Sequence, residues 1–549
     1  MSMKQLKGLT EAQRKEIPQT LSGVCLYASQ KYNKKMAFSM ICDGKIERQI
    51  TYTEMGERSK KIAATLRNMG IQKGDRVLLL SENNPEWALA YFGIALAGAV
   101  SVPLLTGFSI EQIDYIAKHS AAKAACFSKS IAEKVDIGLP VICIDNMLYE
   151  NINHKDIDEI ITENDYSQVQ TPDELASIIY TSGTQGSSKG VMLSSSNLLA
   201  STLSSYYFKD INSKDHFLSV LPLAHSYECG IGFLLPVISG SSVTYLDRPP
   251  SVSVLLPALK LIRPTAMLTV PLLIEKIYNN GIAPKLNKSI LYKFPVTRKL
   301  AILVAGRKLK SSLGGRIRFF GIGGAALCPQ VEKFLHSAGF PYAIGYGLTE
   351  TAPLIAGNSP RRFSYGSGIW APAGVKIRIA KTDENNNGEG EIQVQGPNVM
   401  LGYFNDAEKT TDAFSKDGWL RTGDLGLIDR RGWLHIKGRL KAMILGPSGE
   451  NIYPEEIEGL LGSSQLVEES LVYSGKKGEL VAMVFLNEAA KAAAGAVGAM
   501  ENAMENAMED LRTWVNKKLS AFSRISRIEI RKDPFEKTAT MKIKRYLYI

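Results

Sequence analysis

The sequence predicts an α/β protein with a large N-terminal portion, made of two α/β subdomains and a small β lobe, and a small α+β C-terminal domain. The first observation is the length of 549 residues, which suggests about three to four lobes at roughly 150 residues each. The second is the alternation of helix-like and strand-like segments up to about residue 340. The third is a change near residue 375 to short strands with Gly-rich turns. We expect the two parts to cover residues 1–439 and 440–549.

Apolar spacing places the first elements. KKIAATLRNMG has the period of an amphipathic helix ending at Gly70, and DRVLLLSEN carries apolar residues on both faces, as strands packed between helices do. Residues 87–108 carry no charge and could be taken for a membrane span. Gly98 and Pro103 divide this stretch, so it predicts a buried helix followed by a core strand, VSVPL.

The later segments follow the same logic. A second alternation begins at ELASIIYTSGT and includes the strand-like SSVTYL and AMLTV. VKIRIA, GEIQVQG and WLHIKG predict an antiparallel or barrel-like lobe over residues 375–437. The tail predicts a helix at EIEGLL, a strand at ELVAMVFLN, a helix near LRTWVNKKLSAF and a final strand. The AMEN repeat within residues 489–510 predicts a polar surface helix with a drifting Met stripe.

Composition excludes several classes of protein. Hydrophobic residues make up 45% and charged residues 22% of the chain, close to the globular average, which excludes disordered, collagenous and coiled-coil chains. The six cysteines lie too far apart in sequence for a metal-ligand pair or a disulfide cluster, so we expect a reducing, cytoplasmic compartment. The first residues lack the apolar core of a secretory signal.

The net charge of +11 has one source. Residues 276–331 contain seven Lys, four Arg and no acid, so the rest of the chain sums to zero. Basic side chains there alternate with Leu, Ile, Tyr and Phe, a pattern that favours an anionic membrane surface over nucleic acid. A solvated basic loop is the alternative. We expect no nucleic-acid partner and a peripheral contact with the inner membrane face.

The loop YTSGTQGSSKG at residues 180–190 has the composition of a phosphate-binding loop. Its glycines, hydroxyls and Lys189 can surround phosphate oxygens with N–H groups, O–H groups and a positive charge. It is not a Walker A loop, because Ser188 and Gly190 stand where that motif needs Gly and a hydroxyl residue. A flexible surface turn is the structural alternative.

This loop and six further motifs, in order, resemble those of the acyl-adenylate-forming (ANL) superfamily, which includes acyl-CoA synthetases and luciferases. The resemblance covers about residues 50–549. The six motifs are GGAAL (323–327), GYGLTETAP (345–353), GEGEIQVQGPNVMLGY (388–403), GWLRTGD (418–424), GRLKAMI (438–444) and TATMKIKR (538–545).

The resemblance implies roles for single residues on the nucleotide side. Glu350 would hold Mg²⁺ and Thr349 would contact the phosphates. Tyr346 would stack on adenine, Asp424 would accept from the ribose hydroxyls, and Arg439 would reach the ribose or a phosphate. Ordinary alternatives remain: a cap carboxylate, a core tyrosine, a turn aspartate and a surface ion pair. The other nucleotide-side residues are Thr181, Ser182, Gly183, Thr184, Gly186, Lys189, Gly323, Gly324, Ala325 and Gly347.

The resemblance also gives the C-terminal domain a part in the chemistry. Lys542 aligns with the lysine that bridges the substrate carboxylate and the α-phosphate, although Met541 stands where Gly is usual. Lys441 stands at the hinge about which the small domain rotates; an exposed lysine is the alternative. The pantetheine side is expected to include Gly446, Gly449 and Glu450.

Two segments resemble the long-chain acyl-CoA synthetase branch. IRPTAMLTVPLLIEKIYNNG, residues 262–281, matches that branch around VP-x-x-x-EK-x-Y, with Leu272 where Arg is frequent. His225, in LPLAHSYE, falls beside the family's acyl site, and a core histidine is the alternative.

The expected reaction joins a fatty acid to ATP, giving acyl-AMP and pyrophosphate, and then transfers the acyl group to coenzyme A. ATP, Mg²⁺ and coenzyme A are the expected cofactors and co-substrates. A ligase that delivers to acyl carrier protein, a catalytically silent membrane-associated scaffold and a nucleotide hydrolase are the alternatives. Acyl chain length and oligomeric state stay open.

Overall fold

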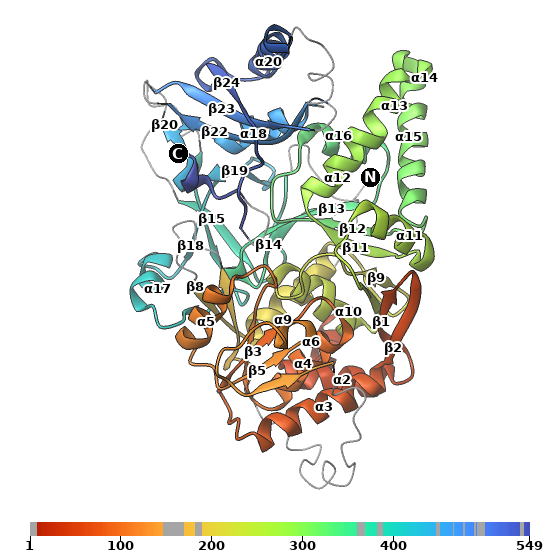
Figure 1. The fold of residues 1–549 in the computed structure, drawn as a ribbon, viewed down its shortest axis with the longest axis vertical. Helices are drawn as coiled ribbons and strands as arrows, with labels where there is room; N and C mark the ends of the chain where they lie inside the picture. The colour runs from red at the N-terminus through yellow and green to blue at the C-terminus, as the bar shows by residue number, and fades with distance from the viewer. Residues whose placement is uncertain are drawn as a thin grey trace.

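The structure is a computed structural model that confirms the α/β class, with a large N-terminal portion and a small C-terminal one (Figure 1). The described residues are 8–145, 170–181, 189–359, 368–380, 388–445, 451–464, 466–475, 478–487, 490, 500–538 and 543–549.

One of the two large sheets has seven strands in the order β17–β8–β7–β4–β3–β5–β6. Its pairs are parallel except β7–β8 and β8–β17, which are antiparallel. The strands are β3 (Arg76–Leu80), β4 (Val100–Pro103), β5 (Ala124–Phe127), β6 (Val141–Cys143), β7 (Leu175–Thr181), β8 (Lys189–Ser194) and β17 (Gly402–Tyr403).

The other large sheet has eight strands in the order β14–β13–β12–β11–β9–β10–β1–β2. It is parallel except for the antiparallel pairs β13–β14 and β1–β2 at its two edges. The strands are β1 (Met36–Cys42), β2 (Lys45–Thr51), β9 (His216–Leu218), β10 (Ser242–Leu246), β11 (Ala266–Thr269), β12 (Phe319–Ile322), β13 (Tyr342–Gly347) and β14 (Leu354–Gly357).

The two sheets exchange strands along the chain. The first two strands, β1 and β2, join the sheet that is otherwise built from residues after 215. β7 and β8, which open the second alternation in the sequence, complete the sheet of the first. Apolar spacing identified the strands, but it carries no information about their partners, so the two sheets are not the two consecutive units that the sequence suggested.

Helix α4 (Pro85–Leu96) fills the core next to these sheets. All twelve of its residues are buried, and Trp87 stacks on Tyr91 with ring centroids 5.2 Å apart. Phe233 packs edge-on against both rings. The uncharged stretch is therefore a core helix followed by β4, as predicted. Across the described ranges, no helix is long and apolar enough to cross a bilayer.

Further helices complete the N-terminal portion. They are α1 (Glu11–Glu16), α2 (Leu21–Tyr32), α3 (Tyr52–Asn68), α5 (Ile110–His119), α6 (Lys129–Ala132), α9 (Ser195–Ser204), η2 (Ser205–Tyr207), η3 (Glu228–Leu234), α10 (Leu235–Ser239), α11 (Val252–Ile262), α12 (Pro271–Ile277), η4 (Tyr278–Ile282), α13 (Ala283–Lys288), α14 (Ile290–Lys293), α15 (Pro295–Ser312), α16 (Pro329–Ser337), η5 (Thr349–Thr351) and α17 (Ala407–Ala413).

The predicted β lobe is an antiparallel sheet in the order β15–β16–β18–β19, which lies between the large sheets and the C-terminal part (Figure 1). Its strands are β15 (Lys376–Ala380), β16 (Glu389–Gln395), β18 (Leu420–Ile428) and β19 (Leu434–Arg439). The short η6 (Leu440–Ala442) follows β19 and leads into the C-terminal part.

The C-terminal part contains the predicted helices and strands. These are β20 (Ile444–Leu445), β21 (Asn451–Ile452), α18 (Pro454–Gly462), β22 (Val467–Ser474), β23 (Leu480–Leu486), α20 (Met500–Asn516), η7 (Ala521–Ser523), β24 (Arg527–Arg531) and η8 (Arg545–Leu547). The AMEN repeat does not make a purely polar surface helix. Met508 is buried with Leu511 and Val515, because one stripe of α20 faces the C-terminal core.

Candidate active site

The site begins where β13 leaves its sheet. Residues 342–344 are buried, and the chain then turns half-exposed from Gly345 to Glu350. A Cβ atom at Gly347 would lie 1.6 Å from the carbonyl oxygen of Pro353, so only glycine fits this close approach. The Leu348 N–H donates to Thr351 Oγ1 at 3.0 Å and closes the turn η5. This turn carries Thr349 and Glu350.

Three of the predicted residues meet at the start of this segment. The hydroxyl of Tyr346 donates to Asp424 Oδ2 at 2.7 Å, and Arg439 Nε lies 2.8 Å from Asp424 Oδ1. The pairing of β18 with β19 sets Asp424 directly opposite Arg439. Burial raises the pKa of Tyr346 well above its usual value, so its hydroxyl stays a donor. A carboxylate has further lone pairs on both oxygens, so Asp424 can still accept from a ligand.

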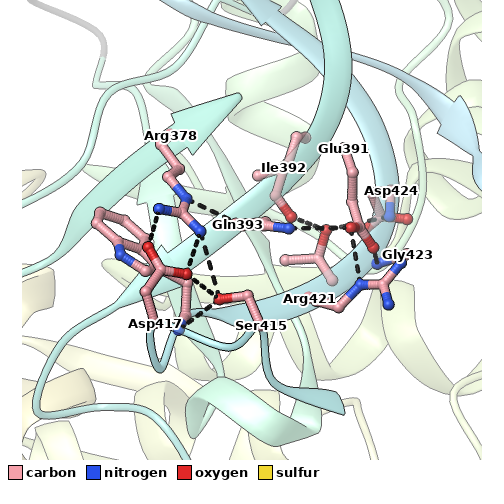
Figure 2. A network of polar contacts seen from close by, with 11 residues as sticks. Arg378, Glu391, Ile392, Gln393, Ser415, Asp417, Arg421, Gly423 and Asp424 are labelled. Atoms are coloured by element: carbon pink, nitrogen blue, oxygen red, sulfur yellow. Dashed lines mark hydrogen bonds and ion pairs between the residues drawn. The ribbon is translucent and has the colours of Figure 1, made fainter. Parts of the chain in front are cut away.

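Hydrogen bonds within the β lobe hold Asp424 and its neighbours in place (Figure 2). Its backbone N–H donates to Thr422 Oγ1 at 3.0 Å, and that hydroxyl donates to the Ile392 carbonyl at 2.7 Å. Glu391 accepts from Arg421 Nε at 3.0 Å and from the Gly423 N–H at 3.3 Å. Since Glu391 is buried, these contacts fix the β16–β18 pair that presents Asp424.

A second cluster lies at the other end of the same segment. The hydroxyl of Tyr403 donates to Glu350 Oε1 at 2.9 Å, and Lys189 Nζ lies 4.6 Å from the centre of the Tyr403 ring. Burial, and then the Glu350 charge, raise the pKa of Tyr403 above its usual value, so it too remains a donor. One tyrosine thus contacts both predicted phosphate-side charges.

Backbone hydrogen bonds fix the position of Tyr403. The Leu401 N–H donates to the Met192 carbonyl at 2.9 Å, and the Phe404 N–H donates to the Gly190 carbonyl at 2.8 Å. The Met400 N–H donates to the carbonyl of Glu350 at 2.9 Å. Residues 400–404 therefore join β8 to the turn that carries Glu350. Thr181 stands directly opposite Lys189 in the β7–β8 pair, at the two ends of the predicted phosphate loop.

The predicted glycine segment also borders this region. Gly323 is buried, and a Cβ there would lie 3.3 Å from the Tyr227 ring and from the Gly345 carbonyl. Gly324 has φ +87°, a conformation that favours glycine, and is exposed like Ala325. The structure therefore brings the GGAAL motif beside the start of the Tyr346–Glu350 segment.

His225 is half-buried, and its Nδ1 accepts from the Tyr227 backbone N–H at 3.2 Å. Beside it, Glu228 is a buried acid in the π-helical turn η3. Ser219 Oγ donates to Glu228 Oε1 at 2.6 Å, and burial raises the pKa of Glu228 to about 8. Burial therefore favours the neutral form of this carboxyl next to His225.

Several predicted residues lie outside the described residues. They are Ser182, Gly183, Thr184 and Gly186 of the phosphate loop, Gly446, Gly449 and Glu450 of the pantetheine side, and Lys542. Lys441 is described: it is exposed in η6, two residues after Arg439. Sequence reasoning missed Tyr403 and Glu391, although both stand in the quoted motif GEGEIQVQGPNVMLGY, where a tyrosine or a buried acid gives no signal of its own.

The residues present fit a magnesium–nucleotide complex. Among the described residues, no group of three or more His, Cys, Asp or Glu side chains could hold a metal alone. Mg²⁺ is commonly bound by one or two carboxylates together with substrate phosphates. Glu350 at the Tyr403 hydroxyl, with Lys189 over the ring of the same tyrosine, provides such a carboxylate near a positive charge.

The fold and this site define a nucleotide-binding enzyme of the adenylating type. Residues 27–404 match the AMP-binding enzyme family. Residues 442–548 match the family of AMP-binding enzyme C-terminal domains. The chain belongs to the AMP-binding enzyme family, within the ANL superfamily.

Curated relatives include the long-chain-fatty-acid–CoA ligase FadD15 of Mycobacterium bovis, 28% identical, covering 92% of this chain and 91% of that protein. The peroxisomal long chain acyl-CoA synthetase 7 of Arabidopsis thaliana is 30% identical, over 85% and 73% of the two chains. Among solved structures, the o-succinylbenzoate–CoA synthetase of Bacillus subtilis with AMP has a TM-score of 0.74 at 25% identity, covering 96% of this chain and 97% of that chain.

The Tyr403 contacts generate a prediction. Tyr403→Phe removes the hydroxyl donor to Glu350 and keeps the ring under Lys189. A hydrogen bond to a charged group is worth about 1.5–3 kcal/mol, so we expect adenylation to fall roughly 10- to 100-fold, with a higher Mg²⁺ requirement. Pyrophosphate release measured against Mg²⁺ checks this. Tyr207→Phe, which removes the hydroxyl that accepts from Arg14, is the matched control. An unchanged Mg²⁺ profile in the Tyr403→Phe variant would contradict the role.

Proposed function

We propose that this protein is an ATP-dependent acid–coenzyme A ligase that activates long-chain fatty acids. One observation carries the proposal: the segment from Tyr346 to Glu350 joins two clusters of polar and charged side chains, one at each end. Tyr346 contacts Asp424, which pairs with Arg439, a set suited to a nucleoside. Glu350 contacts Tyr403, which lies beside Lys189, a set suited to magnesium and phosphates.

In this proposal the chain's own groups hold the two reactants in place. Asp424 accepts from the ribose hydroxyls while Arg439 stays beside it, and Gly323, Gly324 and Ala325 let the base lie against the backbone. Tyr346 packs on the adenine. Lys189, the phosphate loop from Thr181 and the Thr349 hydroxyl surround the phosphates. Mg²⁺ held by Glu350 would withdraw charge from the pyrophosphate leaving group.

The first step then needs no general base, because the attacking carboxylate is already ionised, whereas in the second step the coenzyme A thiol must first lose its proton. A carboxylate oxygen bonds to the α-phosphorus, and the bond from that phosphorus to the bridging oxygen of pyrophosphate breaks. In the second step the thiolate sulfur of coenzyme A attacks the acyl carbon and AMP leaves. Positive charge around the phosphates and fixed reactant geometry supply the rate enhancement.

Lys542 is proposed to bridge the carboxylate and the α-phosphate in the first step. Its basic neighbours have other partners in the C-terminal part. Lys537 forms an ion pair with Glu469, and Lys544 Nζ lies 3.4 Å from Glu536. Arg545 Nη1 contacts both carboxylate oxygens of Glu458, at 2.7 and 3.0 Å. These contacts leave Lys542 as the member of the motif proposed to act on substrate.

The names of the relatives support the finer part of the proposal. FadD15 and synthetase 7 are named as long-chain enzymes, and the Bacillus subtilis synthetase was solved with ATP and magnesium ion. His225 and the pantetheine residues Gly446, Gly449 and Glu450 are proposed for the acyl and coenzyme A sides. We place the protein in the cytoplasm with a peripheral membrane contact through residues 276–331.

A substrate screen tests the function directly. Pyrophosphate release should be highest with saturated acids of long chain, and acyl-CoA should form when coenzyme A is added. Carboxylates from C2 to C18 and aryl acids should be compared with and without coenzyme A. If product forms only with a purified acyl carrier protein, the acceptor is that carrier protein and not coenzyme A. Pyrophosphate release without any acid would indicate a nucleotide hydrolase.

Lys542→Ala should separate the two half-reactions. Deleting a group that stabilises charge in the transition state commonly costs about 100- to 1,000-fold, so acyl-AMP formation from ATP should fall by that much. Conversion of supplied acyl-AMP and coenzyme A should continue. Lys544→Ala is the matched control and should keep both steps. If the Lys542→Ala variant lost both steps equally, Lys542 would not act in the first step alone.

Lys441→Pro should give the opposite separation. Residues 440–442 form a 3₁₀ turn, a conformation with φ of about −60° that suits the fixed φ of proline. A domain rotation that changes φ at this residue would be blocked. Adenylation should persist and thioester formation should fail, while Lys441→Ala keeps both. A normal second step in the Lys441→Pro variant would place the hinge elsewhere.

A further inference from the structure

Three consecutive helices form an extension on the N-terminal portion. After η4, helices α13 and α14 run outward and α15 returns, and together they stand apart from the sheets at the upper right of Figure 1. α14 and α15 contact each other along the extension, and α15 packs on α11 and α16 nearer the body of the protein. The turn around α14 is the outer end of the extension (Figure 1).

Large apolar side chains are exposed at this outer end. The exposed fraction is 93% for Val296, 71% for Ile290 and 61% for Phe294, and Leu291 is exposed as well. On α15 the exposed residues Val296, Leu300 and Val304 recur every four positions and so lie in one stripe. Exposed apolar patches of this kind mark interaction sites when they are contiguous.

Positive charge surrounds the apolar residues. All eleven cations of residues 276–331 are described, and that range contains no acid. Lys276 forms an ion pair with Glu468, and Arg318 forms one with Asp215. No ion pair is found, within the described part of the chain, for the other nine. On and beside the extension these include Lys285, Lys288, Lys293, Arg298, Lys299, Arg307, Lys308 and Lys310.

We propose that the tip of this extension, Ile290–Val296 with the α15 stripe, inserts into the interface of an anionic lipid bilayer. Apolar side chains of that size enter the boundary between headgroups and acyl chains, and flanking Lys and Arg residues contact the anionic headgroups. A second copy of the same surface would bring like charges together. A nucleic-acid backbone would satisfy the cations and leave the apolar tip in water.

The base of the extension faces a different neighbour. Lys276, in α12, contacts Glu468 at 2.8 Å, and Asn279 Nδ2 donates to the Gly462 carbonyl at 3.3 Å. Both acceptors belong to the C-terminal part. Docking through the tip therefore leaves the contacts with the C-terminal domain at the other end of the extension, away from the lipid.

This inference rests on the proposed fatty-acid ligase only for the reason to dock. Binding to vesicles needs neither ATP nor substrate, so it can succeed or fail independently of the enzymatic assays. Co-sedimentation of the full chain with phosphatidylcholine vesicles, with and without about 30 mol% phosphatidylglycerol, is the primary measurement. Binding should require the anionic lipid and weaken as salt rises, because the headgroup attraction is screened.

Two multiple variants separate the contributions. Changing Lys285, Lys288, Lys293 and Lys299 to Gln should weaken binding by about fivefold for each lysine that meets the surface. Arg298 is kept, because its Nε donates to the Tyr292 carbonyl at 3.0 Å and holds the turn. Changing Phe294, Val296 and Leu300 to Ser should weaken binding at least about tenfold.

Matched controls use the same substitutions on other surfaces. Changing the exposed Lys34, Lys45, Lys123 and Lys129 to Gln, or the exposed Ile46, Met69 and Ile110 to Ser, should leave vesicle binding within about twofold of wild type. Circular dichroism and thermal unfolding establish that each variant is folded.

Insertion itself has a direct readout. The tryptophan introduced by Phe294→Trp should be quenched by lipids with brominated acyl chains, whereas the five native tryptophans of the wild type should not. The proposal would be overturned if the quadruple Gln variant and the triple Ser variant both bound vesicles as well as the wild type does. Absence of quenching in the Phe294→Trp variant would also overturn it. So would a dimer, measured by light scattering, that the triple Ser variant dissociates while its vesicle binding is unchanged.

Discussion

The pairing of β17 with β8 is the constraint on which the phosphate side of the site depends. Tyr403 is opposite Val191 in this pair, two residues beyond Lys189, and the neighbouring Met400 N–H binds the carbonyl of Glu350. Three distant parts of the sequence, near residues 190, 350 and 402, are therefore fixed by backbone hydrogen bonds. Side chains that bind ions must be held in place to be effective. Because Tyr403 is fixed in this way and contacts both Glu350 and Lys189, this uncharged residue helps to position both charges.

The proposed nucleoside side of the site depends on a different residue, the buried acid Glu391 in β16. Glu391 accepts hydrogen bonds from Arg421, Gln393 and the Gly423 N–H, and so it fixes the backbone next to Asp424 (Figure 2). Gly423 itself has φ +68°, which glycine adopts without strain. Buried polar networks of this kind are effective when every member has a partner. In the proposed function, Asp424 can then accept from the ribose while its backbone is fixed.

Much of the fold and part of the site could be predicted from the sequence. The uncharged helix at α4 and the antiparallel β lobe follow from apolar spacing, and the structure brings together Asp424, Arg439 and Tyr346, which the motifs assign to the nucleotide side. The exchange of β1–β2 and β7–β8 between sheets could not be predicted, since spacing does not encode partners. Nor could the roles of Tyr403 and Glu391, because those roles arise only when distant strands pair.

The separation of hydrophobic cores bears on how the C-terminal domain can move. Among the described residues, each buried apolar cluster takes its members from one side of residue 439 only. The contacts across the boundary include polar ones, such as Lys276 with Glu468 at 2.8 Å and the Tyr453 hydroxyl with Glu389 at 2.7 Å. An exposed ion pair contributes about 0–1 kcal/mol and a hydrogen bond to a charged group about 1.5–3 kcal/mol, so a rotation that breaks these two contacts costs a few kcal/mol of free energy. Differential binding of acyl-AMP and coenzyme A to two arrangements could supply it, which is why we expect a single residue at the junction, Lys441, to control the second half-reaction.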